Sequence, residues 1–126
     1  MQEAEKIWMN GSLVDWADAK VHVLSHGLHY GSSVFEGIRA YDAEGGTAVF
    51  RLDDHLARLE RSAAQYFMEI PFSREDMRQA VHGVISSNDL SACYIRPIVL
   101  RGYGVMGLFP LDAPVDVSIA AWFWGA

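Results

Sequence analysis

Two long apolar stretches in the last third of the chain most constrain how it can fold. Residues 92–100 are apolar almost throughout, with Arg96 as the exception, and residues 115–124 have a similar character. Such runs predict β-strands that are covered on both faces, so we expect a partner surface from another domain or another subunit. Pro97 lacks the backbone N–H that a sheet ladder needs. It therefore predicts that its strand lies at a sheet edge or is bulged there.

Short hairpins are predicted before these strands. Asn10-Gly11 between two short apolar runs is a strong signal for a tight turn, and it predicts a hairpin over residues 7–14. A second hairpin is expected to join residues 37–41 to residues 48–52 through a longer turn. The segment between the hairpins contains a short extended candidate at 21–24, and then a glycine-punctuated loop with one helical turn.

Two helices are predicted between the second hairpin and the long strands. Asp53 or Asp54 is expected to cap the first, and Ser73 with Asp76 at capping-box spacing begins the second, which Asn88 closes. Their apolar stripes, spaced for one helix face, comprise Leu56, Leu59, Ala63 and Tyr66 in the first and Met77, Val81, Val84 and Ile85 in the second. The order of strands, helices and strands predicts an α+β fold, a mainly antiparallel sheet with two helices packed on it.

Composition narrows the class of protein. A chain of 126 residues, about half of them apolar, suits one domain with a real core. Its net charge of −6 argues against nucleic acid as a partner, and we expect no membrane segment and no signal peptide, hence a cytoplasmic protein. The single cysteine, Cys93, excludes a disulfide within the chain and is expected to be a buried hydrophobe. His26 and His29 have no third ligand nearby, so no metal site is expected.

Three arginines are candidates for binding anions. Arg96 shares a strand face with Tyr94, and a guanidinium inside an apolar strand needs an anion, either an internal carboxylate or a bound carboxylate ligand. Arg58 and Arg61 lie on the first predicted helix, where Arg58 follows Asp54 at ion-pair spacing. A solvated helix face is the simpler interpretation for both, and phosphate binding is the alternative.

Three motifs together resemble the fold-type IV aminotransferases, and bacterial branched-chain aminotransferases in particular. They read HGLHYGSSVFEGIRAY at residues 26–41, FRLDDHLARL at 50–59 and YIRP at 94–97. The resemblance extends over essentially the whole chain. It implies that residues 1–126 form the small N-terminal domain of a two-domain enzyme, in which pyridoxal 5′-phosphate lies between this domain and a larger C-terminal one.

The same resemblance implies roles for individual residues. Arg58 matches the arginine that binds the cofactor phosphate. Arg96, together with Tyr30, matches the pair that receives the distal carboxylate of glutamate or 2-oxoglutarate, and Tyr94 helps to hold the α-carboxylate. Met106 and Leu108 match loop residues that reach the active site of a neighbouring subunit in a homodimer or larger homo-oligomer. The implied substrate-binding set is Tyr30, Phe35, Gly37, Arg39, Tyr94, Arg96, Met106, Leu108 and Trp124.

The catalytic lysine of that family has no counterpart here. The chain contains only Lys6 and Lys20, and both lie outside the family motifs. We therefore expect a fragment that holds half a site and is inactive alone, from a parent that transaminates Leu, Ile and Val with 2-oxoglutarate. The alternatives are a D-amino-acid aminotransferase, an aminodeoxychorismate lyase, or a non-catalytic dimerising module of the same fold.

Overall fold

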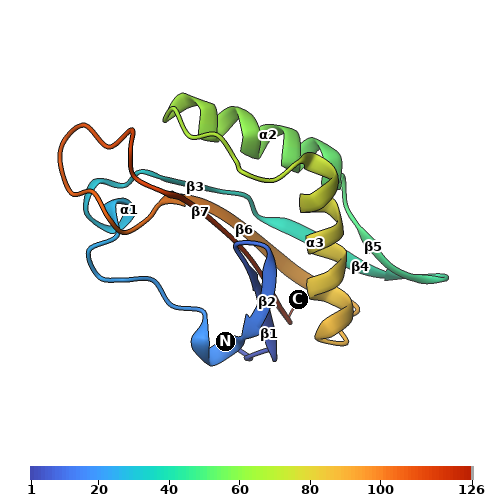
Figure 1. Cartoon of the computed structure of the whole chain (residues 1–126). Coiled ribbons are helices and arrows are strands. Elements are labelled where there is room, and N and C mark those ends of the chain that lie inside the picture. The colour runs from blue at the N-terminus through green and yellow to red at the C-terminus, as the bar shows by residue number, and fades with distance from the viewer. Residues whose placement is uncertain (126) are drawn as a thin grey trace.

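The computed structural model describes residues 1–125 and confirms an α+β fold (Figure 1). Seven strands form one sheet in the order β2-β1-β7-β6-β4-β5, with β3 pairing alongside β6, and all neighbouring strands are antiparallel. The elements are β1 (Lys6–Met9), β2 (Ser12–Asp15), the 3-10 helix η1 (Trp16–Asp18), α1 (His26–Tyr30), β3 (Ser33–Phe35), β4 (Ile38–Ala43), β5 (Gly46–Val49), α2 (Leu52–Gln65), α3 (Arg74–Ser87), β6 (Cys93–Arg101) and β7 (Val115–Trp122).

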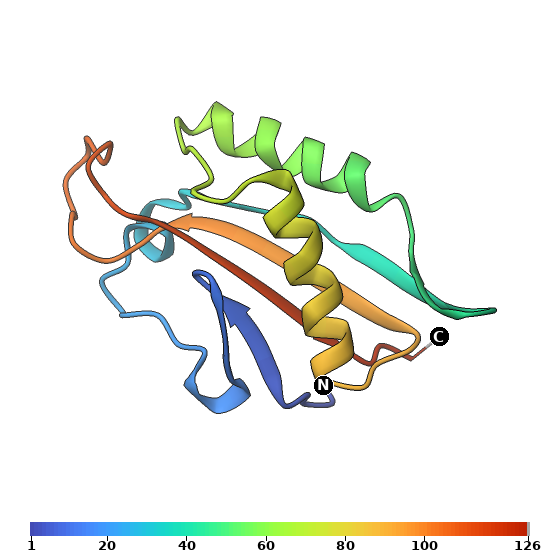
Figure 2. The same ribbon diagram turned by 45° about the vertical axis from the view of Figure 1, so that its right-hand side comes forward.

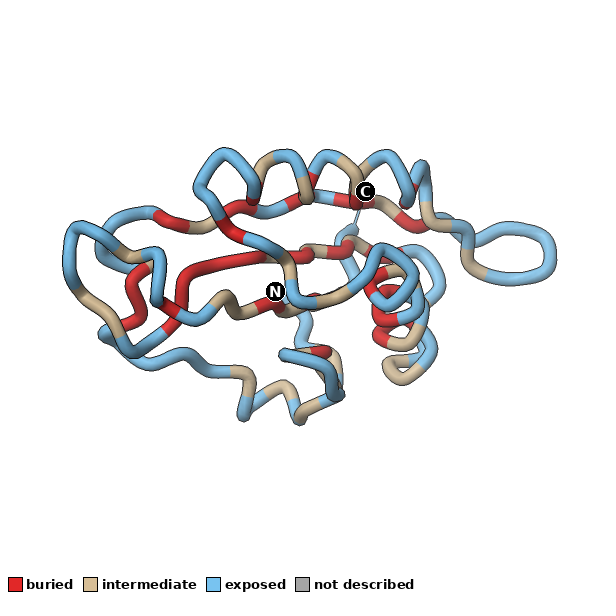
Figure 3. Tube along the Cα trace, turned by 45° about the horizontal axis from the view of Figure 1, so that its top comes forward, coloured by how far each residue is buried: buried red, intermediate tan, exposed pale blue. Residues whose placement is uncertain are grey.

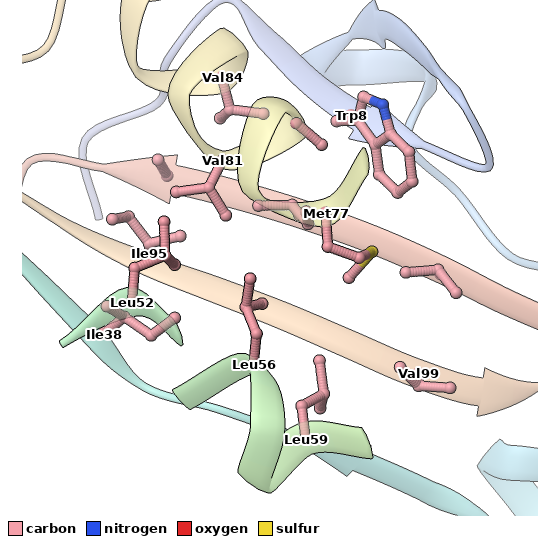
Figure 4. Packing of buried hydrophobic residues seen from close by; sticks show 14 of the residues in the cluster. Trp8, Ile38, Leu52, Leu56, Leu59, Met77, Val81, Val84, Ile95 and Val99 are labelled. Atoms are coloured by element: carbon pink, nitrogen blue, oxygen red, sulfur yellow. The ribbon is translucent and has the colours of Figure 1, made fainter. Parts of the chain in front are cut away.

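Both long helices pack on the same face of the sheet (Figures 1 and 2). Helix α2 lies against β3, and α3 lies against β1 and β7. Their buried stripes meet the inward residues of the central strands, and Figure 4 shows Leu56 and Leu59 of α2 and Val81 of α3 pointing into this layer. Figure 3 shows the same division, with buried positions along the central strands and the inner turns of the helices. We call this side the helix face of the sheet.

The helix boundaries confirm the predicted capping only in part. Ser73 accepts from the Asp76 amide and Asp76 accepts from the Ser73 amide, which is the expected capping box, and Asn88 closes α3. By contrast, Asp53 and Asp54 do not cap α2, because the helix begins earlier, at Leu52, and both lie in its first turn. Tyr66 does not belong to the α2 stripe either, since the helix ends before it and its side chain is exposed.

The hairpins match their predictions more closely than the segment between them does. Asn10 and Gly11 have φ angles of 49° and 103°, which are the positive values that a tight two-residue turn requires. The second hairpin ends sooner than expected, at Val49, and the longer turn predicted for it is wrong, because Ala43 pairs with Gly46 and only two residues lie between the strands. Residues 21–24 form no strand, so that prediction is wrong, whereas the single helical turn is present as α1. Strand β3 was not predicted, because three residues between glycines give too short a pattern to detect.

The long strands differ from the prediction in how they are covered. Over residues 93–99 of β6 and 116–122 of β7, alternate residues face the helices and are buried, while the intervening residues are only partly covered; Leu100 and Arg101 at the end of β6 are both buried. Within residues 1–125 the helices cover one face, and the partner surface expected for the other face stays a prediction. We call this second side the open face. Among these residues no helix has the length and apolar character needed to cross a membrane.

Pro97 lies in a central strand, not at an edge, which corrects the second expectation about β6. One side of β6 pairs with β7 along its whole length. On the other side β3 and β4 follow one another with a break at residues 36–37, and the Pro97 carbonyl accepts from the Glu36 amide at 3.1 Å. A residue's N and C=O point to the same side of a strand, so the missing N–H of Pro97 falls at this break.

Candidate functional site

The break between β3 and β4 brings three consecutive residues to the two faces of the sheet. Phe35 pairs with Ile98, and its ring lies on the open face. The next residue, Glu36, turns its carboxylate to the helix face, where α2 lies. Gly37 follows, opposite the Tyr94 hydroxyl. One short segment therefore contacts both the surroundings of Arg96 on the open face and those of Arg58 on the helix face.

Arg96 on the open face has aromatic neighbours and no carboxylate. Its guanidinium carbon lies 4.1 Å from the Phe35 ring centroid and 5.3 Å from that of Tyr94, and its Nη2 donates to the Tyr94 hydroxyl at 2.8 Å. No salt bridge joins Arg96 to a carboxylate within the described part of the chain. Its Nε is buried without an acceptor, which is costly unless an anion meets it. Of the two alternatives for Arg96 in the sequence analysis, an internal carboxylate or a bound one, the described residues therefore exclude the internal ion pair.

An aromatic group continues the open face from Tyr94. The Tyr94 ring lies 5.1 Å from that of Trp122 and 4.6 Å from that of Trp124, measured between centroids. These contacts bring the predicted Trp124 next to Tyr94 and add Trp122, which the sequence analysis did not select. The period of two along β7 could have found Trp122, because it places residues 118, 120 and 122 on one face. Arg39 pairs with Tyr94 in the sheet register and lies on the same face.

Arg58 on α2 binds a carboxylate on the helix face. Its Nε and Nη2 donate to Oε1 and Oε2 of Glu36, each at 2.7 Å, and Nδ1 of His55 lies 3.0 Å from Oε2. The Glu36 side chain is 4% exposed and that of Arg58 is 59% exposed, so the pair extends from the interior to the surface. The hydrogen bond from Arg58, helped by His55, holds the pKa of Glu36 below its usual value despite burial.

The expected partner of Arg58 was different. Asp54, one helical turn earlier, pairs with Arg51 at 2.7 Å. Arg58 therefore does not form the predicted ion pair along the helix surface, and it is not free of partners either, because Glu36 binds it. The sequence analysis missed Glu36 and His55, although both lie inside the quoted motifs. The alternation of Phe35 and Glu36 across a strand was the available signal, because it turns these two side chains to opposite faces.

A third group lies at the end of the sheet where α1 meets the loop of residues 102–114 (Figure 1). Tyr30 stacks on His26, with centroids 4.4 Å apart, and its hydroxyl donates to the Met106 carbonyl at 3.1 Å. His26 Nε2 lies 3.1 Å from the Gly107 carbonyl. Leu108 extends from this loop and is 87% exposed. The structure thus brings Tyr30 and Met106 together, separately from the contacts of Arg96 and Arg58.

Comparison with known proteins identifies the family. The sequence profile described as amino-transferase class IV matches residues 33–126. The chain belongs to the class IV aminotransferases. That match includes β3, the Glu36–Arg58 pair and both long strands, so the family assignment covers two of the three groups described above.

Relatives within the class IV aminotransferases are close in sequence and structure. A branched-chain-amino-acid aminotransferase of Pseudomonas aeruginosa is 51% identical over 95% of this chain and 39% of its own length, and that of Escherichia coli K12 is 48% identical over 99% and 41%. The structure of a T.th. branched-chain amino acid aminotransferase, complexed with N-(5′-phosphopyridoxyl)-L-glutamate, superposes with a TM-score of 0.95 at 47% identity, covering 98% of this chain and 42% of that one. The chain therefore spans about two fifths of the length of these relatives.

Proposed function

We propose that this chain is the small domain of a cytoplasmic, homo-oligomeric, pyridoxal-phosphate-dependent enzyme that transaminates Leu, Ile and Val with 2-oxoglutarate. The observation that carries this proposal is the environment of Arg96. Its half-buried guanidinium packs on the Phe35 ring and bonds to the Tyr94 hydroxyl, and its buried Nε has no acceptor. The names of the relatives supply the substrate class, since they are branched-chain aminotransferases.

The open face offers the two environments that such an enzyme needs. The rings of Phe35, Tyr94 and Trp124 form an apolar surface against which a branched side chain can pack. Arg96 stands beside these rings and offers a planar fork for the carboxylate of glutamate. One site can therefore accept an apolar side chain and a charged one in turn.

The residues present also fit the cofactor. Arg58 exposes the outer side of a guanidinium whose inner side is already fixed, and this suits a phosphate group. Gly37 leaves the Tyr94 hydroxyl free to reach Arg96. When bound, pyridoxal phosphate supplies the electron-withdrawing system for amino-group transfer. Residues 1–126 contribute binding and orientation, and we propose that the lysine belongs to a second domain of the parent.

Arg96→Gln in the full-length protein tests this function. Loss of a charge-assisted contact should lower kcat/KM for glutamate and 2-oxoglutarate by about 10- to 100-fold, because such contacts contribute roughly 1.5–3 kcal/mol. The half-reaction with leucine serves as the internal control and should change far less. Single-turnover absorbance of the cofactor measures both half-reactions. Equal losses with both substrates, or no turnover in the wild-type protein, would contradict the proposal.

We further propose that residues 1–126 alone are inactive. Lys6 pairs with Asp15 across the first hairpin, and Lys20 follows η1, so neither lysine belongs to the segments that hold Arg58 and Arg96. Incubation of the isolated chain with leucine, 2-oxoglutarate and pyridoxal phosphate should give no glutamate. Any sustained turnover would refute this part of the proposal.

A non-catalytic module is the second candidate, and one observation favours it. Arg58 already has an internal carboxylate partner, as a purely structural arginine would. The two functions differ in a titration of the full-length protein with pyridoxal phosphate, because only the enzyme should bind it saturably.

A further inference from the structure

Glu36 is a buried carboxylate that pairs with an exposed arginine, Arg58, although a surface arginine needs no such partner. It follows β3, its carboxylate is 4% exposed, and both of its oxygens accept hydrogen bonds from Arg58. His55, one turn before Arg58 on α2, lies against the same carboxylate. A long, exposed side chain is thus fixed by a short, buried one.

The geometry of this pair leaves a defined part of the guanidinium available. Arginine has five N–H donors in one plane, and Glu36 takes Nε–H and one hydrogen of Nη2. Nη1 donates to no residue within the described chain, and Nη2 has, besides Glu36, only a 3.5 Å approach to Nδ1 of His55. One hydrogen of Nη1 and the second hydrogen of Nη2 point along a second edge, which can bind two oxygens of a phosphate. Arg58 also lines a surface hollow together with Arg51, Asp54, His55 and Arg61, and Asp54 is already paired with Arg51.

From this geometry we infer that Glu36 is a positioning residue, which fixes the Arg58 guanidinium in the plane that receives the phosphate of the cofactor. The inference rests on the proposed function. Binding to an exposed arginine normally requires the loss of its rotamer freedom, which costs about 0.5–1.5 kcal/mol for each side chain immobilised. In this protein the pair with Glu36 has already ordered the guanidinium before the phosphate arrives.

A simple charge argument leads to the opposite expectation. The negative charge of Glu36 opposes a second anion on Arg58, so its removal should strengthen phosphate binding. Positioning predicts weaker binding instead. The sign of the change in affinity therefore separates the two accounts.

Glu36→Gln in the full-length protein is the test, with equilibrium titration by pyridoxal 5′-phosphate and by pyridoxal, which lacks the phosphate. We expect the Kd of pyridoxal phosphate to rise roughly 3- to 10-fold, in line with the ordering cost above, and that of pyridoxal to stay unchanged. In an Arg58→Ala background the same substitution should have no further effect, because Glu36 acts through Arg58. An unchanged or lower Kd for pyridoxal phosphate in Glu36→Gln would overturn the inference.

The chain provides a matched control. Glu60 accepts from Nε and Nη2 of Arg74 at 3.0 and 2.7 Å, the same two-bond geometry at a place outside the candidate site. Glu60→Gln should leave both affinities unchanged. If wild-type protein binds neither compound, the proposed function fails with the inference, whereas wild-type binding with an unaffected Glu36→Gln variant removes the inference alone.

A measurement on the wild-type protein covers the case in which Glu36→Gln does not fold. The Nε–H resonance of Arg58, assigned by its loss in Arg58→Lys, should be resolved and slow to exchange with water before any cofactor is added. A resonance that exchanges as fast as that of an unpaired arginine would overturn the inference.

Discussion

Gly37 lies so close to Tyr94 that a Cβ at position 37 would stand 2.2 Å from the Tyr94 hydroxyl oxygen and 3.1 Å from its Cζ. With Tyr94 in this position only glycine fits at residue 37, and no positive φ angle adds to that demand. Gly37 lies at the break between β3 and β4, and its lack of a side chain leaves room for the Tyr94 hydroxyl that accepts a hydrogen bond from Arg96.

Gly37→Ala should consequently lower the stability of the fold only slightly and weaken glutamate binding more clearly. The Tyr94 ring can turn away from the added methyl group, so we expect a loss of only about 1–2 kcal/mol in the free energy of unfolding. The displaced hydroxyl can no longer accept from Arg96, and the affinity of the full-length protein for glutamate should fall several-fold. Urea denaturation and glutamate titration measure the two effects. A variant that kept wild-type affinity would show that the hydroxyl is not needed where it is.

Gly83→Ala is the opposite case. Gly83 lies inside α3 with nothing within 4 Å of an added Cβ. Alanine should stabilise the fold by about 0.5–1 kcal/mol, because glycine is a poor residue in a helix interior. Thermal unfolding followed by circular dichroism shows whether Tm rises or falls. A lower Tm would mean that α3 requires a residue without a side chain at position 83.

The Glu36 carboxylate should give the fold a specific acid sensitivity. Its pKa in the folded protein lies below the 4.5 of the free group, chiefly because of Arg58. A depressed carboxyl pKa stabilises the folded state above the unfolded pKa, and this stabilisation disappears as the pH falls through the folded pKa. The stability difference between wild type and Glu36→Gln should thus be constant above pH 4.5 and shrink below it.

Urea unfolding over a range of acidic pH values measures that difference. Glu60→Gln serves for comparison, since Arg74 also lowers the pKa of Glu60, but this pair is about two fifths exposed and more strongly screened by solvent. A difference for Glu36→Gln that grew with acidity would contradict the assigned cause.

Arg101 should be among the most sensitive positions for stability. Its side chain is 2% exposed and donates to the carbonyls of Tyr66, Phe67 and Pro110 at 2.9–3.0 Å. Arg101→Met would leave these acceptors without their donor and should cost about 3 kcal/mol in the free energy of unfolding. Chemical denaturation measures the cost. The full-length variant should also lose order in residues 102–114, which hydrogen-deuterium exchange would detect.

Local patterns predicted the hairpin at Asn10, the capping box at Ser73 and the two long strands, because each depends on residues close together in the sequence. Strand coverage could not be predicted in the same way. The partly covered residues of β6 and β7 include Arg96, Asp116 and Ser118, but they also include apolar and aromatic residues such as Ile98 and Trp122, so the apolar runs did not reveal which face the helices cover. Pro97 illustrates the same limit, since a break in a neighbouring strand removes its demand for an edge position.

The candidate site was predicted unevenly for a similar reason. Resemblance selected Arg58, but its partner Glu36 is 22 residues away in the sequence, and only the packing of α2 over β3 brings the two together. Trp124 was selected through the resemblance, whereas Trp122 was missed, although the period of two along β7 places it on the same face as residues 118 and 120.

The alternation of Phe35 and Glu36 makes the length of this segment as important as its composition. Deleting or inserting one residue before Phe35 would exchange the sides on which the two side chains emerge. An acid would then neutralise Arg96, and a ring would stand where Arg58 needs its partner. A substitution in this segment can weaken one of the two arginine sites gradually, but a change of one residue in length would disable the sites of Arg96 and Arg58 together.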